Sequence, residues 1–162
     1  MCIRDREEAL AVSDRIIVMS NAKIAQQGAP RALYEEPANA FVADFIGDAN
    51  LIDVTVKKVA DGRADVGIGS ATISLPARGL GTGPARVAVR PEALLIGEPG
   101  QAGALPGTIR KCAYLGNHLD IIVESEVGEL FVVQYGAREM LEPGLPVSMS
   151  FSGSGVTLIP PV

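Results

Sequence analysis

Residues 51–68 read LIDVTVKKVADGRADVGI, and they carry the clearest strand pattern of the chain. Ile52, Val54 and Val56 alternate with polar residues, which is the period of two expected of a strand with one buried face. Asp61-Gly62 then supplies a tight turn, and residues 63–68 show a second strand pattern. The stretch therefore predicts an antiparallel hairpin, and we expect a β domain to begin near residue 49.

Further strand patterns follow along the chain, separated by turn signals such as Pro143-Gly144 and Gly153-Ser154-Gly155. Pro91 interrupts one of them because proline has no amide hydrogen to give to a sheet. Many short, evenly spaced strands indicate a small barrel or sandwich. We therefore expect a mainly β fold, with an OB-like small β-barrel over residues 48–162. Its further strands are expected at residues 71–75, 86–90, 93–96, 107–115, 119–124, 129–134, 147–151 and 156–159.

The first 47 residues show helix patterns as well as strand patterns, which predicts an α+β segment before the barrel. Residues 6–13 are good helix formers, and residues 16–19 and 23–27 suggest a hairpin whose turn, Asn21-Ala22, is a poor match to the Asn-Gly preference. Pro30 suits the first turn of a short helix. A second helix, ended by Gly47, carries one apolar stripe that must pack on something. The stripe consists of Ala38, Phe41, Val42, Phe45 and Ile46.

Composition narrows the classes of function. The chain has 162 residues, 48% of them hydrophobic and 20% charged, which is typical of a globular protein. It carries 14 basic and 19 acidic residues, and this acidic balance argues against binding to a phosphate backbone. Cys2 and Cys112 lie far apart and the chain has one histidine, so neither a disulfide framework nor a zinc site is predicted. With no secretion signal and no apolar run of about 18 residues, we expect the chain to stay in the cytoplasm.

The N-terminal part carries spaced motifs at Glu7 to Ile16, Gly28-Ala29-Pro30, Leu33-Tyr34, Pro37 and Phe41 to Gly47. Together they resemble the end of the nucleotide-binding domain of ABC importers, most closely the branch that serves polyamines, ferric iron and aminoethylphosphonate. In that branch a C-terminal transport-associated OB domain, called TOBE, follows directly. Arg90-Pro91-Glu92 and Tyr114-Leu115-Gly116 are similar to recurring features of the TOBE domain.

The resemblance also shows which parts of the ATPase this sequence lacks. The family holds ATP with a P-loop of the form G-x-x-x-x-G-K-[ST] and completes the partner's site with a Leu-Ser-Gly-Gly-Gln segment; neither occurs here. Where the family has a threonine and a switch histidine, this chain has Ile3 and Arg4, and Arg4 should not inherit the histidine's role. We therefore expect no catalytic, cofactor-binding or metal-binding residue and no enzyme activity in this chain. ATP and Mg²⁺ would belong to an intact parent ATPase, with the true N-terminus upstream of residue 1.

Other candidate sites have weaker patterns. His118 lacks a second histidine or cysteine cluster nearby, and we expect it on the barrel surface. Asp120, Glu124, Glu126 and Glu129 are candidate ligands for a cation, but they flank a predicted hairpin, where solvated charges are ordinary. An OB barrel can stack nucleic-acid bases on aromatic side chains, but this one offers only Tyr114, Phe131, Tyr135 and Phe151, and we expect Phe131 and Phe151 in the core.

We hypothesise from these features a regulatory and dimerisation part of an ABC importer ATP-binding subunit, which couples ATP hydrolysis in the missing core to uptake. The expected partners are a second copy of the subunit and the permease subunits, which would hold it at the inner face of the membrane. No nucleic acid and no direct membrane insertion are expected. The alternative is an OB module that senses a small anion or substrate with hydroxyls such as Ser70, Thr72, Ser148 and Ser150.

Overall fold

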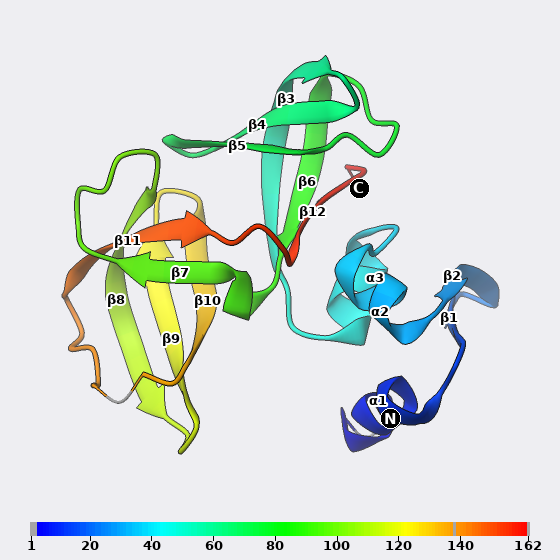
Figure 1. Cartoon of the computed structure of the whole chain (residues 1–162), viewed down its shortest axis with the longest axis horizontal. Coiled ribbons are helices and arrows are strands. Elements are labelled where there is room, and N and C mark those ends of the chain that lie inside the picture. The colour runs from blue at the N-terminus through cyan, green and yellow to red at the C-terminus, as the bar shows by residue number, and fades with distance from the viewer. Residues whose placement is uncertain (1–2, 138, 162) are drawn as a thin grey trace.

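A computed structural model describes residues 3–137 and 139–161, with the side chains described from residue 8 onward (Figure 1). The N-terminal part contains α1 (Ile3–Val12), the hairpin of β1 (Ile16–Ser20) and β2 (Lys23–Gly28), α2 (Pro30–Glu35) and α3 (Ala40–Ile46). Pro30 occupies the first turn of α2, and the Asn39 side chain caps α3 by accepting a 3.0 Å hydrogen bond from the Val42 N–H. The predicted order of helices and hairpin is confirmed.

The predicted hairpin of residues 51–68 forms the centre of the first five-stranded sheet, ordered β12-β6-β3-β4-β5. All neighbours are antiparallel. Ile52, Val54 and Val56 are buried while the residues between them are exposed, as the alternation predicts. The last strand of the chain returns to this sheet, beside β6. The strands are β3 (Asn50–Ala60), β4 (Arg63–Ile68), β5 (Ala71–Pro76), β6 (Gly83–Val89) and β12 (Val156–Ile159).

The second sheet is ordered β10-β9-β8-β11-β7, and its strands lie on the left of Figure 1. A 3-10 turn, η1 (Pro91–Ala93), leads into it from the first sheet, where the sequence predicts that proline interrupts the ladder. The strand predictions in this region are confirmed within a few residues. The strands are β7 (Leu94–Gly97), β8 (Leu105–Tyr114), β9 (His118–Ser125), β10 (Gly128–Tyr135) and β11 (Pro146–Phe151).

One apolar core runs through both sheets, so the mainly β, OB-like fold class is confirmed while its strands divide between two sheets. The core joins Val54 and Val87 of the first sheet to Leu94, Ile121 and Met149 of the second. Edge strands of each sheet also approach each other, β12 near β5 and β7 near β10, so each sheet curls on itself. Phe151 packs against this core at partial burial.

Of two smaller apolar clusters, one holds the N-terminal part together and the other attaches it to the first sheet. Val18, Leu33, Val42 and Ile46 form one, and Ala43 meets the first sheet in another with Ala88 and Ile159. The apolar stripe of α3 is therefore buried only in part. Phe41 is 42% exposed and stacks on Phe45, with ring centroids 5.5 Å apart.

No helix within residues 3–137 and 139–161 combines the length and apolar character needed to cross a bilayer.

Candidate functional site

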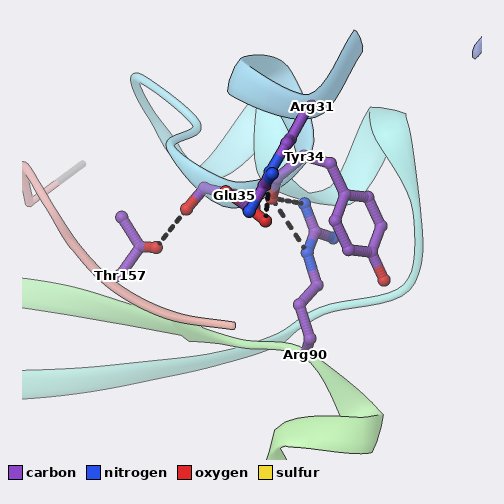
Figure 2. Close-up of polar contacts among 5 residues, drawn as sticks. All are labelled: Arg31, Tyr34, Glu35, Arg90 and Thr157. Atoms are coloured by element: carbon purple, nitrogen blue, oxygen red, sulfur yellow. Dashed lines mark hydrogen bonds and ion pairs between the residues drawn. The ribbon is translucent and has the colours of Figure 1, made fainter. Parts of the chain in front are cut away.

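Among the described residues, Arg90 is the only buried arginine, with 2% of its surface exposed. It lies between β6 and η1. Its guanidinium donates to four backbone carbonyls of the N-terminal part. The acceptors are Tyr34 O at 2.8 Å from Nη2, Ala43 O and Gly47 O at 2.9 Å from Nη1, and Asp48 O at 3.1 Å from Nη1. Figure 2 shows the side chain reaching from the strand toward the end of α2.

These carbonyls belong to the last turns of α2 and α3 and to the residues just after α3. The last C=O groups of a helix have no partner within the helix, and the helix dipole makes that end partly negative. A planar guanidinium with five N–H donors satisfies several such groups at once. Arg90 therefore closes the C-terminal ends of two helices from a residue of the β part.

The ring of Tyr34 completes the contact. The guanidinium carbon of Arg90 lies 4.1 Å from the ring centroid, a cation–π arrangement, and Tyr34 Oη donates a 2.6 Å hydrogen bond to Glu92 Oε1. Gly47 permits this packing, because a Cβ there would lie 3.2 Å from Tyr34 Cε2. A side chain at position 47 would therefore require the Tyr34 ring to shift away from its place beside Arg90.

Burial and hydrogen bonding set the protonation states at this contact. Burial raises the pKa of the Tyr34 phenol well above its usual range, and the Glu92 carboxylate adds to the rise. Burial lowers the pKa of Arg90, while Tyr34, Glu92 and Asp48 oppose that shift. Since an arginine starts from a pKa above about 12, it stays charged. Tyr34 therefore remains a donor and Arg90 a cation at neutral pH.

Thr157 and Arg78 make further hydrogen bonds between the N-terminal part and the first sheet, close to Arg90. Thr157 Oγ1 donates to the Glu35 backbone carbonyl at 2.7 Å, drawn in Figure 2, and Arg78 donates to Glu36 O at 3.2 Å and Pro37 O at 2.8 Å. Arg78 also donates to Leu158 O at 3.1 Å, so it ties the segment after α2 to the last strand. We call these contacts the joint. It is made of Tyr34, Arg78, Arg90, Glu92 and Thr157 with the carbonyls that they hold.

The sequence pointed to part of the joint. Arg90-Pro91-Glu92 and Leu33-Tyr34 appear there as separate motifs, 56 residues apart between Tyr34 and Arg90, and the fold brings them into contact. Arg78 and Thr157 carried no sequence signal, since their role depends on a left-handed turn at Arg78 and on the return of the last strand.

The other candidate residues lie elsewhere. His118 is partly exposed, as expected for the surface; its Nε2 lies 3.2 Å from Asp120 Oδ1, and its ring centroid lies 5.4 Å from that of Tyr135. Arg4 belongs to α1, but its side chain lies outside the described part, as does Cys2. The acidic residues separate, since Glu124 pairs with Arg110 at 2.9 Å and Glu126 accepts from Ser70 N at 2.6 Å.

The hydroxyls of the anion-sensing hypothesis also do not converge on a common partner in the described structure. Ser70 and Thr72 lie in or beside β5, whereas Ser148 is buried on β11 and its hydroxyl accepts from Gln101 N at 3.3 Å. The aromatic residues considered for base stacking differ in their exposure. Phe131 is half-buried, and Tyr114 and Tyr135 are exposed at one end of the second sheet.

Comparison with known proteins places this geometry in context. Residues 87–159 match the model of the TOBE domain. The chain is 45% identical over 155 residues to an Fe(3+) ions import ATP-binding protein, FbpC 1, of Rhizobium meliloti, covering 96% of this chain and 44% of that protein. It is 40% identical over 154 residues to the spermidine/putrescine import ATP-binding protein PotA of Ruegeria pomeroyi, covering 92% and 42%. The chain thus spans less than half the length of these relatives.

Among solved structures, the chain is similar to the cytoplasmic molybdate-binding protein ModG. The TM-score is 0.54 at 20% sequence identity, and the match covers 69% of this chain and 96% of that one. At 20% sequence identity, this similarity is evidence for a shared fold alone.

Proposed function

Since the chain carries a TOBE domain and matches ABC importer ATP-binding proteins over nearly all of its length, we propose that it forms the regulatory and coupling part of such a subunit. Residues 1–47 would be the end of the nucleotide-binding domain and residues 48–162 the TOBE/OB-like part. ATP and Mg²⁺ would bind elsewhere in the intact subunit, because this sequence lacks a P-loop.

The observation that carries this proposal is the set of hydrogen bonds between Arg90 and the ends of α2 and α3. Hydrogen bonds from one guanidinium to several carbonyls are directional, so the helices cannot rotate against β6 without breaking them. A displacement of the nucleotide-binding part would therefore be passed to the barrel as a rigid-body movement.

The barrel would pass the movement to a second copy of the subunit, with the permease subunits as further partners at the inner face of the membrane. One end of the second sheet offers a surface for pairing of the two copies. Tyr114 pairs with Leu119 and Tyr135 pairs with His118 in the strand register, and both tyrosines are more than half exposed. Exposed aromatic residues of this kind are enriched in protein interfaces.

A chimera tests the proposal. The matching 155 residues of Rhizobium meliloti FbpC 1 would be replaced by this chain, and ATP hydrolysis and iron uptake would be measured in membranes that contain the permease. We expect Arg90→Lys to lower uptake per ATP hydrolysed by about tenfold, because an ammonium cannot hold four carbonyls in the fork geometry of arginine.

Arg86→Lys is the matched control, since Arg86 lies on β6, just before Arg90 in the chain, and its ion pair is with the exposed Asp53 on the neighbouring strand. Equal coupling in the Arg90 and Arg86 variants would exclude the joint as the coupling element. ATP turnover by the present chain alone would contradict the assignment of catalysis to another part of the subunit.

A further inference from the structure

A cavity of about 700 Å³ lies against the joint, on the side of α2. Its walls come from α2, from β4 and β5, and from the segment that joins β11 to β12. Polar side chains on these walls include Arg31, Arg63, Arg78, Ser152, Ser154 and Thr157. We infer that this cavity binds a small organic polyanion, such as a phosphorylated sugar or a polycarboxylate, and that the bound anion bridges α2 and the first sheet.

The three arginines approach the cavity from three different elements. Arg78, in the turn after β5, is fixed by its hydrogen bonds to Glu36, Pro37 and Leu158 carbonyls and forms a rigid wall. Arg63 is oriented by Ser74, whose Oγ accepts from Nε at 3.1 Å and whose backbone O accepts from Nη2 at 2.6 Å. Among the described residues Arg63 Nη1 has no partner, so an oriented guanidinium still has N–H groups to give.

Arg31, on α2, is the adjustable side of the cavity. Its side chain is 84% exposed, and its Nε lies 2.9 Å from Glu35 Oε1, while both terminal nitrogens lack a partner within the described chain. An exposed ion pair of this kind contributes little stability. A bound anion can therefore compete with Glu35 for this guanidinium at low cost.

The charges and the volume define the class of ligand. The residues that line the cavity include three arginines and two glutamates, Glu35 and Glu36. A single negative charge gains little against this mixture, whereas a ligand with two or more charged oxyanion groups can pair with guanidinium groups on separate walls. The volume lies in the range of small-molecule sites, so it suits an organic polyanion better than inorganic phosphate.

Hydroxyl and backbone groups extend the polar surface. Ser154 N donates to Ser152 Oγ at 3.4 Å, and the Ser154 hydroxyl has no hydrogen-bond partner in the described structure. Thr157 already links the cavity wall to α2 through the Glu35 carbonyl. An anion held by Arg31 and Arg63 would add a second link between the same elements, so binding would stiffen the joint.

Isothermal titration calorimetry on this chain at low ionic strength tests the inference directly and does not depend on ATP hydrolysis. The ligands are citrate and fructose 1,6-bisphosphate, with inorganic phosphate and neutral fructose as references. We expect at least one organic polyanion to bind with a Kd below about 1 mM, and inorganic phosphate to bind about tenfold more weakly. Absence of binding by both organic anions, or equal binding of inorganic phosphate, would overturn the inference.

Matched variants locate the site. Arg63→Gln and Arg31→Gln should each weaken the binding by about tenfold, since each removes a charge-assisted contact. Arg31 is exposed on α2, so its replacement tests the site even if Arg63→Gln perturbs the hairpin. Arg110→Gln is the control, because Arg110 pairs with Glu124 on the second sheet, away from the cavity. An equal loss in the Arg110 variant would assign the binding to general surface charge and refute the site.

Discussion

The Asn50 side chain pairs with the backbone of Phe131 in both directions. Nδ2 donates to Phe131 O and Oδ1 accepts from Phe131 N, each at 2.8 Å. The carboxamide thereby takes the place of a neighbouring strand at the outer edge of β10 and connects the start of the first sheet to the second. An edge strand leaves backbone groups unpaired, so this contact protects β10 as well as joining the sheets.

Replacing Asn50 by alanine should lower the free energy of unfolding by about 1–2 kcal/mol, because two half-buried backbone groups lose their partners. Urea unfolding measures the change. Thr72→Ala is the control, since Thr72 is exposed on β5 and makes no side-chain hydrogen bond in the described structure. Equal midpoints for the two variants would show that the pairing adds nothing to stability.

Removal of the Tyr34 hydroxyl isolates one bond of the joint. Tyr34→Phe keeps the ring beside Arg90 but loses the donor to Glu92, so we expect a loss of about 0.5–1.5 kcal/mol. Thermal unfolding measures it. Tyr135→Phe, at a 65% exposed tyrosine, should leave the unfolding temperature nearly unchanged. A loss in the Tyr135 variant as large as that at Tyr34 would contradict a specific contribution of the Tyr34–Glu92 hydrogen bond.

The turn of the first hairpin stores strain that glycine can release. Asn21 and Ala22 have φ of 49° and 58°, the left-handed values of a type I′ turn, and alanine there costs about 1–2 kcal/mol. Glycine also loses more backbone entropy on folding, about 0.5–1 kcal/mol. We therefore expect Ala22→Gly to stabilise the protein by about 0.5–1 kcal/mol, measured as the urea midpoint.

A second glycine substitution serves as its control. Ala60 is exposed near the end of β3 and has no positive φ. Ala60→Gly should therefore destabilise the chain by about 0.5–1 kcal/mol. If both substitutions changed stability in the same direction, strain at residue 22 would not be the cause.

Glu126 gives the connection between the sheets a pH dependence. Its carboxylate accepts from Ser70 N at 2.6 Å, and hydrogen bonding with the side chain and backbone of Ser70 lowers its pKa below the ordinary value of 4.5. A carboxyl group with a lowered folded pKa contributes stability that is present above pH 4.5 and lost as the pH falls through the folded value. Glu126→Gln should therefore lower the free energy of unfolding at pH 7. At low pH the free energies of unfolding of the variant and the unsubstituted chain should lie closer together.

Unfolding by urea at pH 7 and near pH 3 measures that difference. Glu129→Gln is the control, because Glu129 is an exposed glutamate on β10 without a side-chain hydrogen bond in the described structure. A difference between Glu126→Gln and the unsubstituted chain that stays constant with pH would rule out the lowered pKa as its origin.

Local patterns were sufficient for most of the secondary structure. The alternation of residues 52–56, the Asp61-Gly62 turn and the Pro30 helix start all depend on neighbours along the chain, and all appear where predicted. Phe41 shows the limit of such patterns. Its position on the apolar stripe of α3 fits burial, but the helix packs through Val42, Ala43 and Ile46 and leaves Phe41 at the surface.

Residue type and short-range spacing were enough to predict the mainly β class and the order of helices and strands, and to find the motifs that resemble an importer subunit. The packing in three dimensions divides the strands between two sheets and places β12 at the edge of the first, beside β6. It also decided that Arg90 meets Tyr34 and that Asn50 meets Phe131. These contacts join residues 56 and 81 positions apart, so they depend on how the sheets curl and pack, which no local pattern encodes.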